Sequence, residues 1–372
     1  MRIQLFLLLI LIVMYGCGGG STTPDPVSPA PGVSTNQAFT AVLDQHDVPA
    51  IAGAYIERGQ IIEQFALGKR LAQGAETVVI TDRWHLGSVT KSVTATLAAI
   101  LIEQGQLNWD TTIADVFDRS EYDAKYTNVT LEQLLSHTAG IEADILRVDG
   151  WDNYFTSQLP IRQQRTQLSI SLLALPGNRI GSFSYSNGGY VIAGHMLERI
   201  MDQTWEDLLE EYLFIPLGIQ DVQFGAPTDG FMNSQPYGHR LQNNSWLAVS
   251  PDDPYSDNPA AMGPAGTLSM SLASLAVYTI EHLSGRNGES SLLTQTSFVR
   301  LHQPVAGTDY AMGWFTKGTN VYHMGTNTMW YAHVGMDFGN KDIAVIALTN
   351  VGSERGTAVT DNMIDVLLDR NY

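Results

Sequence analysis

Strand-like segments stand at both ends of the globular part of the chain, and a long mixed segment separates them. Residues 49–68 read as a β-hairpin, because two apolar runs flank a turn that contains glycine. A helix is expected from about Ser88 to Gly105, and the middle of the chain holds helical pieces and many loops. Strand-like runs return near the C-terminus, at about residues 310–315, 320–323, 330–338 and 342–350. This order predicts an α+β fold, with an antiparallel sheet built from both termini, flanking helices and an inserted, mostly helical lobe.

The length and composition fit this division of the chain. The 372 residues suffice for two ordinary domains or for one large unit with an insertion. A hydrophobic share of 44% excludes a wholly disordered chain. We expect a signal peptide over 1–16, a flexible linker rich in Gly, Ser, Thr and Pro over 18–36, an α/β lobe over 37–105 together with 265–372, and a helical lobe over 106–264.

The N-terminal segment predicts export from the cytoplasm. Residues 5–15 form an unbroken apolar run, which is too short for a membrane-spanning helix of about 20 residues but fits a secretory signal. Cys17, the single cysteine, follows where bacterial lipoproteins carry their acylated cysteine. We therefore expect an extracytoplasmic protein that is anchored to a membrane through lipidated Cys17. The alternatives are a plain secreted protein or an uncleaved anchor.

The charge and the absent motifs exclude several classes of protein. A formal net charge of −18 disfavours nucleic acid as a partner, because an acidic surface repels phosphates. A single cysteine cannot form a disulfide within the chain or a Cys-rich zinc site. The sequence contains no GxSxG, HExxH or GxxxxGK(S/T) motif, which argues against a nucleophile elbow, a metalloprotease of that type and a P-loop. We expect no metal and no cofactor.

The strongest candidate for chemistry is the pair Ser88 and Lys91. Because they stand three residues apart on an expected helix, their side chains share one face. Residues 92–102 carry no charge and are apolar nearly all round, which predicts a buried helix. Burial and the positive end of the helix would disfavour a charged lysine, and a neutral amine could take the serine proton. In the alternative interpretation, Ser88 only caps the helix and Lys91 extends to solvent.

Two further segments carry candidate side chains. Tyr185 could pass protons if a neighbouring cation lowered its pKa, and Asn187 could orient a lysine or bind a substrate amide. His323, Gly325 and Thr326 end a predicted strand, where glycine would permit a close approach of substrate and the next N–H could bind an oxyanion. Each segment also fits an ordinary turn, with Asn187 as the cap of a helix that begins near residue 190.

Taken together, these motifs resemble those of the serine β-lactamase and penicillin-binding superfamily. That family's order is SxxK, here at Ser88, then YxN, here at Tyr185, then a strand motif, here at His323. The tyrosine is typical of class C β-lactamases and of related esterases and D-amino-acid peptidases. Further similar segments are LLSHTAG (134–140), PG (176–177), PLGI (216–219), GPAGTLS (263–269) and YAMGW (310–314). The resemblance runs over about residues 38–368.

The chain departs from the family's pattern at three points. Pro176 and Tyr185 lie farther apart than is usual, and Thr326 stands where a second glycine is expected. His323, mostly neutral at its reference pKa of about 6.5, replaces the lysine that usually meets a substrate carboxylate. We therefore rank esters and D-amino-acid peptides or amides above β-lactams as substrates.

The resemblance implies a serine hydrolase that forms an acyl-enzyme with a small-molecule or peptide substrate. The catalytic residues that it implies are Ser88, Lys91 and Tyr185. The substrate-binding or oxyanion residues that it implies are Asn187, His323, Gly325 and Thr326. Two other histidines, His137 and His333, are expected to be structural. The alternative function is that of a binding protein, for penicillin or another cell-wall ligand, that kept the fold without turnover.

Overall fold

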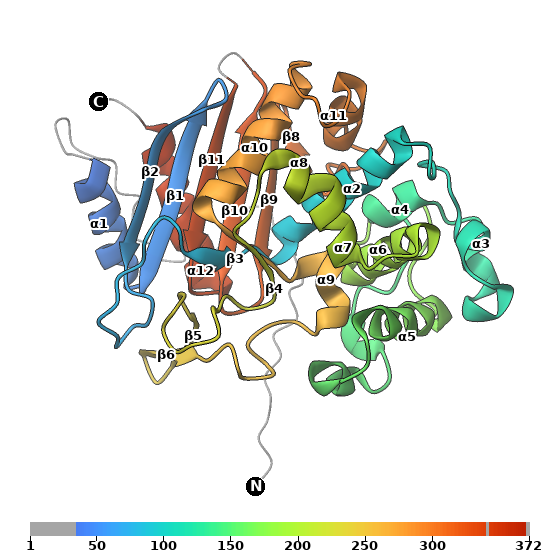
Figure 1. Ribbon diagram of the computed structural model, residues 1–372, viewed down its shortest axis with the longest axis horizontal. Helices are drawn as coiled ribbons and strands as arrows, with labels where there is room; N and C mark the ends of the chain where they lie inside the picture. The colour runs from blue at the N-terminus through green and yellow to red at the C-terminus, as the bar shows by residue number, and fades with distance from the viewer. Residues whose placement is uncertain (1–34, 340–341, 370–372) are drawn as a thin grey trace, which may run out of the picture.

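The sheet at the centre of the molecule joins the two ends of the chain. The computed structural model describes residues 35–339 and 342–369. Within them, six antiparallel strands run in the order β2-β1-β11-β10-β9-β8 (Figure 1). Their bounds are β1 (Ala50–Glu57), β2 (Gln60–Gly68), β8 (Phe315–Lys317), β9 (Asn320–Thr326), β10 (Tyr331–Asp337) and β11 (Ile343–Thr349). Because β1 pairs with β11, with Gly53 opposite Ala347, the predicted α+β fold with a sheet built from both termini is confirmed.

Helices cover both faces of this sheet (Figure 1). Successive residues of β1 point to opposite faces, and both sets are buried. Ile51 belongs to the core under α1 (Thr35–His46) and α12 (Ser353–Leu368), whereas Ala52 belongs to the core on the side of α10 (Leu272–Arg286). Both sides of β1 are therefore shielded from water, which explains its almost continuous apolar sequence.

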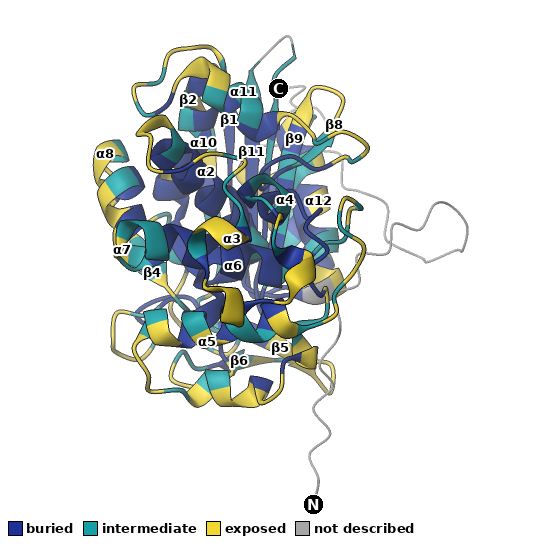
Figure 2. Ribbon diagram, turned by 90° about the vertical axis from the view of Figure 1, so that its right-hand side faces the viewer, coloured by how far each residue is buried: buried dark blue, intermediate teal, exposed yellow. Residues whose placement is uncertain are grey.

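The apolar helix predicted after Ser88 runs through the middle of the molecule as α2 (Thr90–Glu103). All of its residues from Thr90 to Leu101 are buried (Figure 2). A 3-10 turn over Gly87–Val89 precedes the helix, so Ser88 lies in this turn rather than in the helix itself. Gly105 follows the helix in a left-handed conformation with a φ of +73°, as expected for a glycine at a helix end.

The segment between residues 106 and 264 contributes most of the helices that lie beside the sheet (Figure 1). These are α3 (Ile113–Val116), α4 (Leu131–Leu135), α5 (Ile161–Ala174), α6 (Asn187–Met201), α7 (Trp205–Leu209) and α8 (Ile215–Leu217), and α9 (Gly263–Gly266) and α11 (Gln295–His302) follow in the chain. The helix expected to begin near residue 190 ends at Met201, because the backbone turns left-handed at Asp202 with a φ of +55°, and α7 follows as a separate helix.

This middle segment is not helical throughout. It also contains β4 (Val222–Phe224) and the hairpin of β5 (Gly238–Gln242) and β6 (Ser245–Val249). Strand β4 pairs with β7 (Leu268–Ser271), and β7 pairs in turn with β3 (Arg83–His85). This small sheet matters for the site, because β3 leads directly into the turn that carries Ser88.

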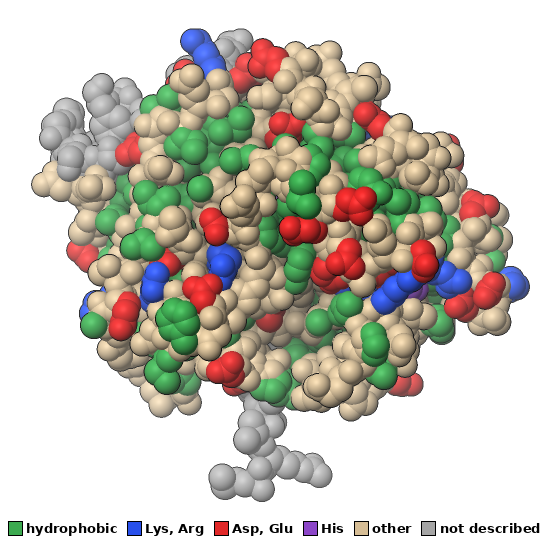
Figure 3. Space-filling model, viewed as in Figure 1, with side chains coloured by type: hydrophobic (Ala, Val, Ile, Leu, Met, Phe, Trp, Pro, Cys, Tyr) green, Lys and Arg blue, Asp and Glu red, His purple; other side chains and the backbone are tan. Residues whose placement is uncertain are grey.

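The outer surface is acidic, as the net charge of −18 requires. On the face shown in Figure 3, carboxylate side chains are scattered among neutral and hydrophobic ones and a smaller number of Lys and Arg side chains. Among the described residues, no helix combines the length and the apolar character that crossing a membrane would need. The expected signal peptide and Cys17 lie outside the described residues.

Candidate active site

Ser88 lies at the junction of strand β3 and helix α2. Gly87 takes a left-handed conformation with a φ of +50°, and a Cβ at this position would lie 2.3 Å from Thr326 N. Glycine is therefore required both for the turn and for the close contact with β9. Ser88 is partly exposed, whereas Gly87 and Val89 are buried. The serine is thus the member of this turn that solvent or a substrate can reach.

Lys91 is buried, and its amine contacts the side chain of Ser88. Nζ lies 3.0 Å from Ser88 Oγ, 2.7 Å from Asn187 Oδ1 and 2.7 Å from Ala265 O. The side chain has an exposed fraction of 0%, and this burial lowers the pKa of the Lys91 amine well below its usual value. The lysine therefore does not extend to solvent, which removes the alternative interpretation of the Ser88–Lys91 pair.

The contacts of Nζ suit a neutral amine that accepts the serine proton. The oxygens of Asn187 and Ala265 can only accept hydrogen bonds, so they take the two N–H groups of the neutral amine. The lone pair then faces Ser88 Oγ, and the serine hydroxyl can donate to it. A base in direct contact with a hydroxyl nucleophile is the arrangement that activates serine for attack.

Tyr185 adds an aromatic ring beside the same amine. Lys91 Nζ lies 5.0 Å from the centre of the Tyr185 ring, and the phenol forms a hydrogen bond with Ser88. Burial raises the pKa of the Tyr185 phenol, and the hydrogen bond with Ser88 offsets only part of the rise. The pKa of this phenol is therefore not lowered by a neighbouring cation, as the sequence suggested it could be, but raised by burial. Tyr185 keeps its proton at neutral pH.

Asn187 is the first residue of helix α6 rather than the cap of a helix that begins near residue 190. Ser186 occupies the N-cap position, with an extended backbone, and its hydroxyl donates to Glu142 O at 2.7 Å. The side chain of Asn187 is thus free of a capping role, and its Oδ1 accepts from Lys91 Nζ. The start of α6 brings Tyr185 and Asn187 to the amine from a part of the chain far from Ser88.

His137 anchors the segment that carries Tyr185 through hydrogen bonds to its backbone. Ser184 N donates to His137 O at 2.8 Å, and Ser186 N donates to His137 Nδ1 at 3.1 Å. The imidazole ring also packs on Tyr185, with 4.2 Å between the ring centres. Burial holds the pKa of His137 well below its usual value. These contacts fit the structural role expected for this histidine.

Strand β9 brings Gly325 and Thr326 against the turn at Ser88. A Cβ on Gly325 would lie 2.0 Å from Leu86 O and 2.5 Å from Ser88 N, so a residue with a side chain does not fit there. We expected this glycine to make room for substrate, but it makes room for the backbone of the Ser88 turn. Thr326 is partly exposed at the end of the strand.

His323 is held by the protein rather than offered to a ligand. Its exposed fraction is 1%. Nδ1 donates to Met324 O at 2.7 Å, so Nε2 accepts from the Tyr310 hydroxyl at 3.0 Å. Burial lowers the pKa of His323 to about 3, so the ring is neutral. The expectation that His323 lines the substrate site is therefore corrected, because both ring nitrogens are occupied by protein groups.

Two groups at the site were not predicted from the sequence. The backbone oxygen of Ala265 accepts from Lys91 Nζ, and a backbone oxygen leaves no side-chain signal. Tyr310 donates to His323 and lies with its ring centre 4.7 Å from that of His137. Both residues lie in segments that resemble the family, GPAGTLS and YAMGW, and these segments were the available signal.

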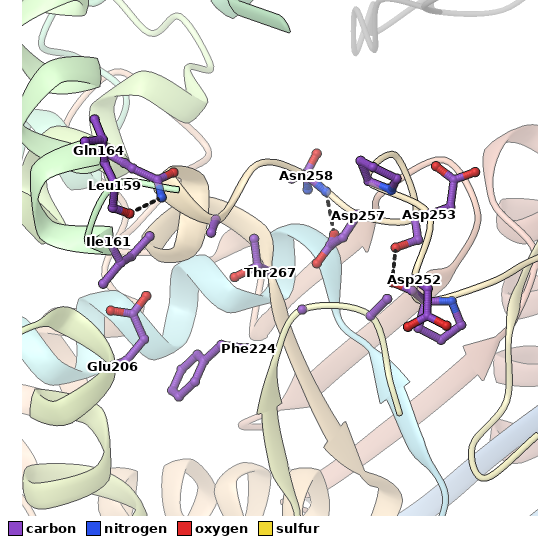
Figure 4. A pocket seen from close by; sticks show the side chains of 16 residues that line it. Leu159, Ile161, Gln164, Glu206, Phe224, Asp252, Asp253, Asp257, Asn258 and Thr267 are labelled. Carbon is purple, nitrogen blue, oxygen red and sulfur yellow. Dashed lines mark hydrogen bonds between the residues drawn. The ribbon is translucent and has the colours of Figure 1, made fainter. Parts of the chain in front are cut away.

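A cavity of about 490 Å³ lies next to α9, and the residues that line it do not include Ser88, Lys91 or Tyr185. Its wall includes Thr267, which directly follows α9, and Asn258, whose Nδ2 donates to Gly266 O at 2.9 Å. Figure 4 shows Gln164 and Glu206 across the cavity from Asn258 and Asp257. Among the described residues, no group of three or more His, Cys, Asp or Glu side chains could hold a metal ion.

A Ser–Lys pair joined by a tyrosine and an asparagine, on an antiparallel sheet with a helical layer beside it, defines a protein with the β-lactamase and penicillin-binding fold. The chain belongs to the Beta-lactamase family, whose model matches residues 35–369.

Two curated relatives illustrate this membership. The chain is 30% identical to Penicillin-binding protein 4 of Amycolatopsis lactamdurans over 279 residues, which cover 73% of this chain and 69% of that protein. It is 20% identical to Protein flp of Staphylococcus aureus (strain MW2) over 324 residues, which cover 84% of this chain and 61% of that protein. The chain therefore matches only part of the length of these relatives.

Solved structures share the fold. A class C beta lactamase from Rhodobacter sphaeroides matches with a TM-score of 0.68 and 18% identity, over 90% of this chain and 99% of that chain. A D-amino acid amidase from Ochrobactrum anthropi SV3, complexed with L-phenylalanine, matches with a TM-score of 0.69 and 18% identity, over 90% of this chain and 97% of that chain. At this level of identity, the similarity concerns the fold alone.

Proposed function

We propose that the protein is a serine hydrolase that works through an acyl-enzyme on Ser88. The observation that carries the proposal is the buried amine of Lys91, 3.0 Å from Ser88 Oγ. Burial lowers the pKa of this amine, and its contacts with Asn187 and Ala265 leave the lone pair for the serine proton. A lysine with a purely structural role would not need to contact the hydroxyl of a serine that a substrate can reach.

The reaction begins when Ser88 Oγ attacks the carbonyl carbon of the substrate and Lys91 takes the hydroxyl proton. The backbone N–H groups of Ser88 and Thr326 would hold the oxyanion, and the close packing of these two segments supports that role. The proton then passes to the leaving group, with the Tyr185 phenol in the relay, and an ester of Ser88 remains. A water molecule attacks this ester with the same base, and Ser88 regains its proton. General-base help of this kind is worth about 10²–10⁴ in rate.

Among possible substrates, we propose esters and D-amino-acid peptides or amides ahead of β-lactams. The support comes from His323, which is buried, neutral and bonded through both nitrogens. This position therefore supplies no positive charge for a substrate carboxylate. One solved structure with the same fold is named a D-amino acid amidase, which is consistent with this ranking.

Steady-state hydrolysis of p-nitrophenyl butyrate, D-alanyl peptides and nitrocefin tests both the function and the ranking. We expect turnover of the ester or the D-peptide, loss of that turnover in Ser88→Ala, and slower turnover of nitrocefin. Turnover of nitrocefin far above the other two would overturn the ranking. Full activity in Ser88→Ala would overturn the proposed nucleophile.

We also propose that the protein acts outside the cytoplasm, held on a membrane by a lipid on Cys17. The support is the N-terminal sequence alone, namely a short apolar run followed directly by the single cysteine. Metabolic labelling with a fatty acid should modify the wild-type protein and leave Cys17→Ser unlabelled. Equal labelling of both proteins would contradict this assignment.

A further inference from the structure

His85 supports the turn that carries Ser88. It lies three residues before the serine, at the end of β3, and its exposed fraction is 1%. Gly87 N donates to His85 Nδ1 at 3.0 Å. Because Nδ1 accepts this hydrogen bond, the proton of the neutral ring resides on Nε2. This bond helps to hold Gly87 in the left-handed conformation from which Ser88 follows.

Asp257 stands beside the other nitrogen of this ring. Its Oδ1 lies 2.7 Å from His85 Nε2, a contact that is short but too bent for an ideal hydrogen bond. The side chain of Asp257 is 10% exposed and that of His85 is 0% exposed, so water screens the contact little. A carboxylate at this position favours the ring proton on Nε2, which keeps Nδ1 available to accept from Gly87.

The same carboxylate oxygen also holds the strand on the other side of the site. Asp257 Oδ1 accepts from Asn327 Nδ2 at 3.0 Å, and Asn327 directly follows Thr326. Asn327 Oδ1 accepts from Met329 N at 3.2 Å, which orients the amide with its nitrogen toward the carboxylate. Asp257 Oδ1 further accepts from Asn258 N at 2.7 Å (Figure 4). One oxygen atom thus ties together three separate segments of the chain.

We propose that Asp257 is a positioning residue that sets the spacing of the two oxyanion N–H groups, through His85 on one side and Asn327 on the other. The inference rests on the proposed function, which assigns those N–H groups to Ser88 and Thr326. Asp257 contacts neither of these residues directly. Its effect passes through the residues that anchor each segment, which already pack closely where Gly325 meets the Ser88 turn.

Kinetics of Asp257→Ala on the ester substrate test this proposal. The variant loses the carboxylate that contacts His85 and accepts from Asn327, and we expect kcat to fall about 10- to 100-fold, somewhat less than the loss of an oxyanion donor. We expect KM to stay within about three-fold, because the oxyanion, whose hydrogen bonds the variant weakens, forms only in the transition state. The pH at which activity rises should not move, because the contacts of Lys91 with Asn187 and Ala265 remain.

Two further variants calibrate the result. Asp257→Asn keeps an oxygen for Asn327 but loses the charge beside His85, so its kcat should fall between those of the wild type and Asp257→Ala. Asp252→Ala removes a charge from the same loop, where the side chain is exposed, and should match the wild type. If Asp257→Ala does not fold, Asn327→Ala removes one of the two ties and should lower kcat in the same way.

Activity is expressed per serine that a fluorophosphonate labels at completion, so that a loss of folded protein is not counted as a loss of rate. A wild-type kcat per labelled site in Asp257→Ala, or equal values for the alanine and asparagine variants, would overturn the proposal. If the wild-type protein itself is neither labelled nor active, the proposed function fails instead. The two failures are therefore distinguishable.

Discussion

Among single residues, Lys91 and Tyr185 are the titratable groups in contact with Ser88, and their pKa values set the charge of the site. Burial lowers the pKa of the Lys91 amine and raises the pKa of the Tyr185 phenol. Both shifts favour the uncharged forms, so the site keeps a base and an acid side by side rather than an ammonium and a phenolate. Such a pair can take a proton from Ser88 and return one to the leaving group without a large change of charge in a buried place.

These shifts predict the pH dependence of ester hydrolysis. The base form of Lys91 increases as the pH rises through its lowered pKa, so kcat/KM should rise with pH and level off well below pH 10.5. The raised pKa of Tyr185 should prevent a fall up to pH 10, the usual pKa of a phenol. A pH–rate profile corrected for spontaneous hydrolysis measures this. A clear loss of activity between about pH 8 and 10 would contradict the assignment of Tyr185 as a phenol.

At the scale of elements, the site depends on a contact between strand β9 and the turn before helix α2. Gly325 and Gly87 provide the space for this contact, since a Cβ on either residue would lie within 2.5 Å of backbone atoms of the other segment. The turn carries Ser88 and the strand carries Thr326. A change in this spacing would therefore separate the nucleophile from one of its proposed oxyanion donors.

We predict that Gly325→Ala impairs both stability and activity. The new methyl group must push β9 away from the turn, which should cost about 1–3 kcal/mol of unfolding free energy and lower kcat about 10²-fold or more. Gly335→Ala in β10 is the matched control, because its Cβ would meet its nearest neighbour, Val345 Cγ2, at an ordinary 3.5 Å. Urea unfolding and ester kinetics measure both effects. Equal behaviour of the two variants would contradict the role given to the contact.

The sequence predicted the long elements of the fold better than the short ones. Strands β1 and β11 and helix α2 are apolar along most of their length, so the sequence of each element alone was enough to predict that it is buried. Strand β4 has only three residues and pairs with β7 far along the chain, and no local pattern encodes that pairing. Helix α1 was not predicted either, although its buried residues Ala38, Phe39 and Val42 fall at helical spacing within TNQAFTAVLDQH.

At the site, residue types could be predicted but their environments could not. The spacing of Ser88 and Lys91 and the apolar helix behind them suggested a buried amine, and the lysine is buried. The surroundings of His323 depend on Tyr310 and on how β9 packs, and these are properties of the tertiary structure. The raised pKa of Tyr185 has the same origin, since its largest cause is burial by residues from distant segments.

At the scale of the whole molecule, several histidines are buried and neutral. Burial lowers the pKa of His323 and His282 to about 3 and that of His239 and His333 to about 4. Burial also holds the pKa of two others, His137 and His302, well below the usual value. In the unfolded chain each of these side chains would bind a proton below about pH 6.5. Unfolding therefore takes up protons in mild acid.

This proton uptake predicts that stability falls between about pH 6.5 and pH 5. The folded pKa values lie below the unfolded one, so stability is complete above the unfolded pKa and is lost as the pH decreases. Each histidine that stays neutral contributes about 1.4 kcal/mol per pH unit, and six together should give several kcal/mol per unit. Urea midpoints measured across this range test the prediction. A constant midpoint would show that these histidines are not buried as described.

Covalent labelling of the full chain with a fluorophosphonate, followed by peptide mapping with mass spectrometry, is the most direct test of the proposed chemistry. The proposed chemistry predicts one adduct, on Ser88, no adduct in Ser88→Ala, and labelling that is slower by about 10² or more in Lys91→Ala. A folded wild-type protein that remains unlabelled, or that carries the adduct on another residue, would contradict it.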